Sequence, residues 1–148
     1  MKKKPKSVGT ILERECETAI KEWLRRVNLV ADLTAIPLSD ADRTNHLSKL
    51  YQDLIFRLRL AKDVQSPVST AAAAHGRVRR GQGYSASMLI EESRVFQVVT
   101  FGTLHLHQSE LDPNQVLLDA MVIADEVDAQ LMETVRSLMA PSPAETAA

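Results

Sequence analysis

Apolar residues recur every three or four positions along most of the chain, the spacing that places side chains on one face of an α-helix. The first run begins at Thr10, where Thr10 and Glu13 have the spacing of a capping box, and it ends near Asp32. This pattern predicts an amphipathic first helix. Its inner stripe consists of Leu12, Cys16, Ala19, Trp23, Val27 and Val30.

A second helix is predicted after a break at Pro37. Ser39 followed by Asp42 is typical of a helix start, and the second helix is expected to stop before Ser66 and Pro67. The apolar residues between these signals keep helical spacing, so they predict one amphipathic helix. Its inner stripe consists of Leu47, Tyr51, Leu54, Leu58 and Ala61.

A third and a fourth helix are predicted on either side of a glycine-rich turn. The third is short and rich in alanine, from about Ser69 to Arg80, and we expect Gly81 or Gly83 to take the left-handed conformation after it. Ser85 then caps a fourth helix that lasts to about residue 109 or 110. The fourth helix is apolar on several faces, which is typical of a buried helix.

A fifth, long helix is predicted from Asp112 and Pro113 to about Met139, because Asp112 suits an N-cap and proline suits the first helical position. Its nearly heptad stripe fits either packing within the bundle or a dimer seam, and the sequence leaves both interpretations open. The stripe consists of Ala120, Ala124, Val127, Leu131, Val135 and Leu138.

These elements predict an all-α fold, a single bundle of about five helices with a buried fourth helix and a long C-terminal helix. The bundle is expected to occupy residues 10–140. Residues 1–9 are basic and are expected to be a flexible N-terminus, and residues 141–148, with two prolines, are expected to be a disordered tail or the start of a linker.

Composition narrows the classes of partner. The 148 residues suit one domain, and 18 lysines and arginines against 19 acidic residues give a net charge of -1, so no broad positive field is available for a nucleic acid. The longest uncharged run, residues 95–109, is shorter than the roughly 20 apolar residues of a membrane span. No apolar signal segment follows Met1. We expect a cytoplasmic protein with protein or small-molecule partners and neither nucleic acid nor membrane as a partner.

No familiar catalytic arrangement is present. Cys16 lies on the apolar stripe of the first helix and is expected to be a core residue. His105 and His107 are two positions apart, so they point in different directions on a helix and cannot bind one metal ion together. The string 81–83 lacks the lysine and the preceding strand of a phosphate-binding loop. An enzyme would need a cleft with perturbed acids such as Glu91 and Glu92. The protein is therefore expected not to be an enzyme, and to use no catalytic residue, metal site or cofactor.

The segment 73–94 concentrates glycine, histidine and arginine. His75 and Arg79 are four residues apart and share a helix face, and we expect Arg79 to face the core and to pair with Glu92 on the next helix. Arg77 and Arg80 share another face. They are interpreted either as solvated charges at a helix C-terminus or, together with His75, as contacts for a ligand or an anion.

The same segment resembles a known family. The run His75-Gly76-x-x-Arg79-x-x-Gln82-Gly83-Tyr84, followed by Leu89 and Glu92-x-Arg94, is similar to the N-terminal helical domain of RsbT co-antagonist proteins of the RsbRD type. Similar domains stand at the N-terminus of some bacterial sensor histidine kinases. The resemblance covers roughly residues 10–138. The signature residues that it implies are His75, Gly76, Arg79, Gln82, Gly83, Tyr84, Glu92 and Arg94.

The resemblance implies a non-catalytic input domain of bacterial stress (stressosome) or two-component signalling. Its partner would be a STAS-domain regulator, a switch kinase or a histidine kinase core, and it would act as a homodimer. Such a domain should expose an apolar or mixed face, on the first or the fifth helix. The alternative is a small-molecule or heme-binding sensor of globin-like fold, which would need an apolar pocket near His75.

Overall fold

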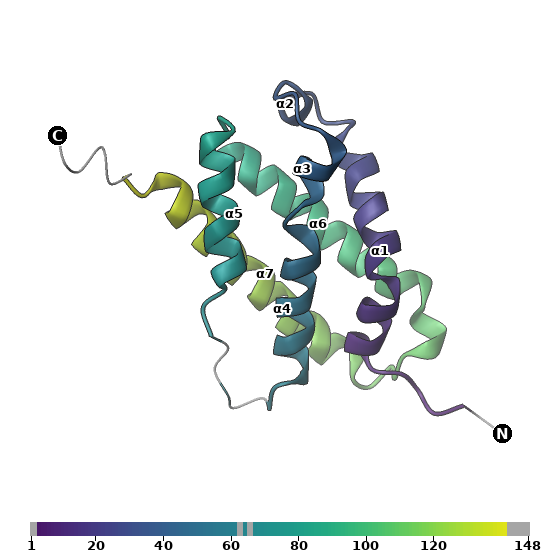
Figure 1. Ribbon diagram of the computed structural model, residues 1–148. Coiled ribbons are helices and arrows are strands. Elements are labelled where there is room, and N and C mark those ends of the chain that lie inside the picture. Colours follow the sequence, from purple (N-terminus) through teal and green to yellow (C-terminus); the bar gives the residue numbers. More distant parts are fainter. Residues whose placement is uncertain (1–2, 62–63, 65–66, 142–148) are drawn as a thin grey trace.

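The computed structural model describes residues 3–61, 64 and 67–141, and within them it shows an all-α bundle (Figure 1). The expected fold class is confirmed. The only β-pairing in the described part is an isolated bridge between Lys6 and Leu111. The helices are α1 (Val8–Val27), α2 (Ala31–Thr34), α3 (Asp40–Thr44), α4 (Leu47–Arg59), α5 (Thr70–Gly81), α6 (Ala86–Leu106), the short 3₁₀ helix η1 (Gln108–Glu110) and α7 (Val116–Met139).

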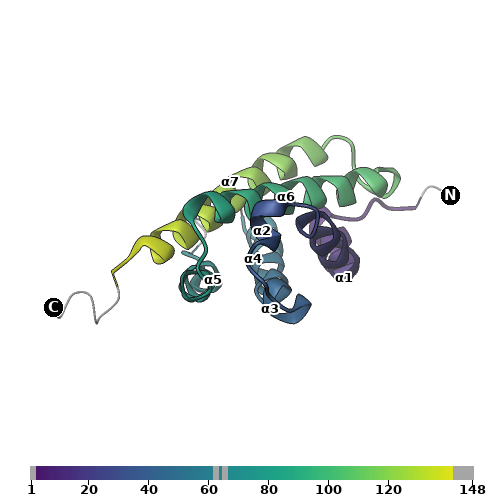
Figure 2. The ribbon, with the colours of Figure 1, turned by 90° about the horizontal axis from the view of Figure 1, so that it is seen from above.

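The helices form two layers. Figure 2 shows α6 and α7 side by side in one layer, with α1, α4 and α5 beneath them. α1 packs against α4 and α6, and α5 packs closely along α7. The core between the layers is mostly apolar, and its fully buried apolar side chains include Trp23, Tyr51, Leu54, Leu89 and Ile123. In the described part, no helix is long and apolar enough to cross a membrane.

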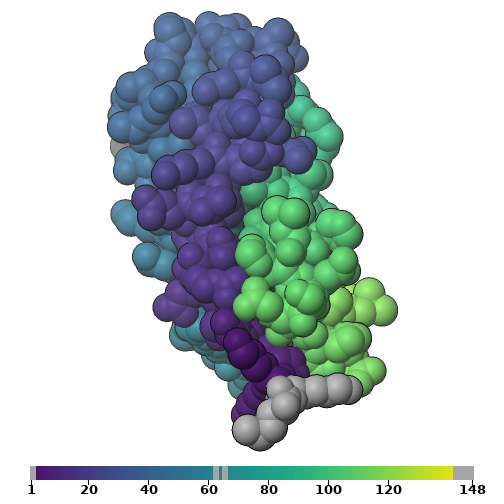
Figure 3. Space-filling view, turned by 90° about the vertical axis from the view of Figure 1, so that its right-hand side faces the viewer, coloured from purple at the N-terminus to yellow at the C-terminus, as the bar shows by residue number. Residues whose placement is uncertain are grey.

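The first helix begins nearer the N-terminus than the sequence indicated. α1 begins at Val8, and its N-cap is Ser7, whose hydroxyl oxygen accepts the N–H of Thr10 at 3.1 Å. The expected capping box at Thr10 and Glu13 is therefore wrong. The Lys6 N–H donates to the Glu110 carbonyl at 2.8 Å, so the chain is fixed beside the end of α6 (Figure 3). α1 thus begins two residues before residue 10, where the bundle was expected to start, and Val8 is buried.

The second predicted helix is divided in two. Ser39 caps α3 as expected, with its hydroxyl accepting the N–H of Asp42 at 3.1 Å. Asn45 and His46 form a turn between α3 and α4, which begins at Leu47, although the backbone of both residues stays in the right-handed helical region. The predicted apolar stripe begins only at Leu47, so it did not indicate this break. The break matters because it turns Arg43 and His46 toward α5 and α6.

The turn between the third and fourth predicted helices is confirmed. Ser69 caps α5 and Ser85 caps α6, each accepting a backbone N–H three residues later. Gly83 has φ of 87°, the left-handed conformation that glycine adopts at little cost, and the described part contains no other residue with positive φ. α6 buries Leu89, Val95, Phe96 and Val99 on its inner side.

α7 begins at Val116, three residues later than Pro113, because the Asp112 side chain accepts the N–H of Asn114 and forms a turn there. The heptad-like stripe of α7 faces the bundle. Val127 and Leu138 are buried, and Leu131 and Val135 pack against the core. These residues complete the core of the chain itself. The predicted tail falls mostly on residues 142–148, which lie outside the described residues.

Candidate functional site

Arg79 of α5 and Glu92 of α6 form a buried ion pair. Nε and Nη2 of Arg79 donate to Oε1 and Oε2 of Glu92, both at 3.0 Å, and the two side chains are 0% and 4% exposed. Such a bidentate hydrogen bond fits the planar guanidinium and holds the carboxylate in one orientation. The pairing predicted from the sequence is confirmed.

The remaining donors of Arg79 are also satisfied. Nη1 donates to Oε1 of Gln82 at 2.7 Å, and Nη2 donates to the carbonyl oxygen of Arg43 at 2.7 Å. The guanidinium carbon lies 4.6 Å from the centre of the Tyr84 ring, which adds a cation–π contact. Arg79 therefore joins the end of α5 to α3 and α6.

Tyr84 and Arg43 join Arg79, Glu92 and Gln82 in what we call the polar cluster. The Tyr84 hydroxyl donates to Oε2 of Glu92 at 3.3 Å and accepts from Nη1 of Arg43 at 3.2 Å. Arg43 also donates to the carbonyl oxygens of Leu33 and Ile36. Sequence reasoning missed Arg43, which has no distinguishing local pattern. Its role follows from burial, since an arginine that is 4% exposed needs several acceptors.

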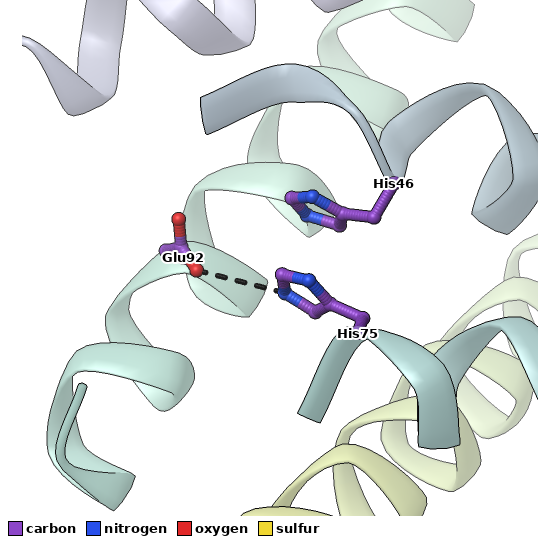
Figure 4. A group of neighbouring side chains, drawn as sticks. All are labelled: His46, His75 and Glu92. Carbon is purple, nitrogen blue, oxygen red and sulfur yellow. Dashed lines mark ion pairs between the residues drawn. The ribbon is translucent and has the colours of Figure 1, made fainter. Parts of the chain in front are cut away.

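Two histidines lie against one another beside Glu92. The His46 and His75 rings are stacked, with centroids 3.4 Å apart and planes inclined by 10° (Figure 4). Nε2 of His75 is 3.7 Å from Oε1 of Glu92, and the Trp23 ring meets His46 edge-on at 5.8 Å. The Trp23 indole N–H donates to the Glu92 carbonyl at 3.1 Å. Sequence reasoning missed His46 here, because it lies far from His75 along the chain.

Burial keeps both imidazoles uncharged at neutral pH. It lowers the pKa of His46 well below the usual 6.5, and the neighbouring His75 and Arg79 lower it further. Burial also lowers the pKa of His75, although the contact with Glu92 opposes that shift. Burial is also the main reason why the pKa of Tyr84 is raised. The cluster thus contains two neutral imidazoles beside a salt bridge.

The stacked histidines lie between two hollows. On the inner side is a cavity of about 30 Å³, and its polar walls come from His46, His75, Glu92, Ser93, Gln130 and Thr134. On the outer side, between α3, α4 and α5, is a groove of about 160 Å³ lined by Asp42, Lys49 and Arg79 together with the same two histidines. The inner cavity has room for about one or two water molecules. It has no room for a substrate of ordinary size.

Gly76 allows α5 to lie directly on α7. A Cβ at this position would collide with the carbonyl oxygen of Thr134 and would lie 2.8 Å from Cβ of Ser137. The Ser137 hydroxyl donates to the Ala73 carbonyl at 2.6 Å across the same contact. The contact fixes the position of α5, and therefore of His75 and Arg79, relative to the last helix.

The other predicted site residues lie apart from the cluster. Arg94 is exposed and pairs with Glu91 at 2.6 Å. Arg77 is exposed whereas His75 is buried, so the structure does not bring these two together as an anion site; Arg80 is half-buried. His105 is exposed and Nδ1 of His107 lies 3.2 Å from Glu110. Cys16 is half-buried rather than fully buried, and burial raises the pKa of its thiol.

One apolar surface remains uncovered on the layer formed by α6 and α7. We define this outer face by Ile90, Val98, Leu118, Met121, Met132 and Met139, which are 42–70% exposed. On α7 these residues follow one another at helical spacing on the side opposite Val127 and Leu138, with Asp125 and Asp128 between them.

Comparison of the chain with protein-family models, with curated proteins and with solved structures finds no match in any of the three.

Proposed function

We propose that the chain is a non-catalytic input domain of signal transduction that acts through protein–protein contacts, as its resemblance to RsbRD-type N-terminal domains implies. The observation that carries this proposal is the outer face of α6 and α7. Such a domain was expected to expose an apolar or mixed face on its first or last long helix. The outer face lies mainly on the last one.

The polar cluster supports a structural rather than a catalytic role for the signature residues. In the described residues every fully buried side-chain nitrogen or oxygen has a hydrogen-bond partner. Arg79 and Glu92 are occupied with each other and with neighbouring groups. A satisfied buried network fixes the relative positions of the helices that it joins.

The contact at Gly76 suggests how a signal would travel. α7 touches α5, and so the polar cluster, on one side and carries the outer face on the other. In proteins of the resembled family the last helix leads to an output domain. A shift of α5 relative to α7 would therefore change the surface that a second copy, a STAS-domain regulator or a kinase core contacts.

Sedimentation velocity tests the dimer part of this proposal. The parent chain is expected to sediment as a homodimer, and the double substitution Met121→Glu and Met132→Glu is expected to give a folded monomer, because it places charges within the apolar contact. Leu29→Glu is the matched control, since Leu29 is 76% exposed but lies outside the outer face. A monomeric parent chain that binds neither a STAS-domain regulator nor a kinase core would contradict the proposal.

The heme-sensor alternative finds little space. The two histidines are in ring contact, and the cavity beside them measures about 30 Å³, so a macrocycle would have to separate α4 from α5. An absorption spectrum of the chain mixed with hemin tests this alternative directly. A stoichiometric Soret band that is lost in His75→Ala would favour it over the proposal above.

A further inference from the structure

We propose that His46, His75 and Glu92 form a binding site for a divalent transition-metal ion such as Zn²⁺ or Co²⁺. The three residues come from three separate parts of the chain: the junction before α4, the middle of α5 and the first half of α6. Metal binding at this cluster is independent of the partner contacts proposed for the outer face.

The donor atoms are close enough to share one ion. One ligand atom from each of the three residues lies within 4.8 Å of the other two. Figure 4 shows the two ring edges that carry these nitrogens facing the same side as the Glu92 carboxylate. Two imidazoles and a carboxylate are a known donor set for zinc, with a further position left for water. The imidazole majority favours zinc, cobalt, nickel or copper over magnesium and calcium.

The geometry requires one adjustment. A metal ion lies near the plane of each imidazole that binds it, whereas the two rings are now nearly parallel, with centroids 3.4 Å apart. The rings must therefore tilt apart on the side that faces Glu92. His46 can make this movement because its side chain is only half-buried and, among the described residues, neither of its ring nitrogens has a hydrogen-bond partner.

Glu92 is already oriented for the role. Arg79 and Tyr84 hold its carboxylate, and a carboxylate oxygen has a second lone pair available for a metal ion after it has accepted one hydrogen bond. Bonded partners behind a ligand are typical of metal sites because they fix its direction. The positive charge of Arg79 also weakens binding, so the site is expected to exchange its ion with solution.

The two hollows supply a route and a vacant coordination position. The outer groove reaches His46 and His75 from the surface between α3, α4 and α5. The inner cavity of about 30 Å³ adjoins Glu92 and both rings, and it can hold the water that would complete the coordination. Both histidines are neutral as they stand, which is the form of imidazole that binds metal.

Trp23 provides a built-in reporter, because it is the only tryptophan and its ring touches His46. Tag-free chain stripped with EDTA is titrated with Co²⁺ and with Zn²⁺ while Trp23 fluorescence is recorded. The expected result is saturation at one equivalent, with Mg²⁺ giving no change. His46→Gln is expected to weaken binding by at least about 100-fold, since the loss of a supporting partner alone costs roughly 10- to 100-fold.

His105→Gln is the matched control, because it removes an exposed histidine outside the cluster and should bind like the parent chain. His46→Cys retains a ligand atom and should restore binding, with a thiolate-to-cobalt absorption band in the near ultraviolet. A fold defect in His46→Gln would therefore not decide the question, since the cysteine variant reports separately. The proposal is overturned if the parent chain shows no saturable change with Co²⁺ or Zn²⁺, or if His46→Gln binds as tightly as His105→Gln.

Discussion

Arg79 and Glu92 lie on either side of the turn at Gly83 and form a bidentate ion pair in which Arg79 is fully buried. Their mutual orientation determines how α5 meets α6. Arg43, His75, Tyr84 and Trp23 all contact one member of this pair or the backbone that carries it. The pair is therefore the centre of the polar cluster.

Removal of Arg79 should be far more costly than removal of an exposed arginine. Arg79→Ala leaves the Glu92 carboxylate buried without its main partner, and we expect a loss of about 3–5 kcal/mol in the free energy of unfolding. Arg94→Ala, which breaks the exposed pair with Glu91, should lower the free energy of unfolding much less, because solvent screens an exposed ion pair. Urea unfolding followed by circular dichroism measures both values. Equal losses of unfolding free energy in the two variants would show that the buried pair stabilises the fold no more than the exposed pair does.

Gly76 should tolerate no side chain. Gly76→Ala places a methyl group against the Thr134 carbonyl, which is backbone and cannot move without shifting α7, so we expect destabilisation by about 1–3 kcal/mol. Gly102→Ala is the control on α6, where an added Cβ meets nothing within 4 Å. Alanine there should instead raise stability by about 0.5–1 kcal/mol through its helix propensity. Thermal unfolding should move in opposite directions for the two variants, and the same direction in both would contradict the close packing of α5 on α7.

Substitution of the two glycines before α6 by alanine should have different effects on stability. Gly83→Ala forces a side chain into the left-handed conformation at φ of 87°, and we expect a cost of about 1–2 kcal/mol. Gly81 has no positive φ and open space around it, so Gly81→Ala should be neutral or slightly stabilising. The measurement is the melting temperature of each variant. Equal melting temperatures for the two variants would mean that Gly83 does not need its special conformation.

Glu126 should make the stability of the protein depend on pH. Burial raises the pKa of this carboxyl above its usual value of 4.5, so the folded chain retains the proton to higher pH than the unfolded chain does. The contribution of Glu126 to stability is therefore fully present below the unfolded pKa and is lost as pH rises through the folded pKa. Glu126→Gln should stabilise the protein at pH 7 and have little effect near pH 4.

Asp128→Asn is the control for this prediction, because Asp128 lies exposed on the same helix. Its melting temperature should differ from that of the parent chain by a similar small amount at both pH values. A stabilisation by Glu126→Gln that persisted unchanged at pH 4 would point to packing rather than to ionisation.

Local patterns in the sequence predicted much of the helical framework. The starts of α3, α5 and α6 were visible in Ser39, Ser69 and Ser85, because an N-cap bonds to a backbone group only three residues away. The left-handed glycine was visible for the same local reason. The pairing of Arg79 with Glu92 was also within reach, since only one turn separates their helices.

The interruption at Asn45 and the places of Arg43 and His46 were decided by the tertiary structure. His46 contacts His75 and Trp23 only because α1, α4 and α5 converge on α6. No local sequence pattern predicts contacts between residues so far apart in the chain. The same holds for α7, where a heptad-like stripe faced the core and the opposite side remained exposed. By itself the sequence determined where helices form and which of their residues are apolar, because those depend on near neighbours. Which faces meet, and which buried charges find partners, depended on packing between residues far apart in the chain.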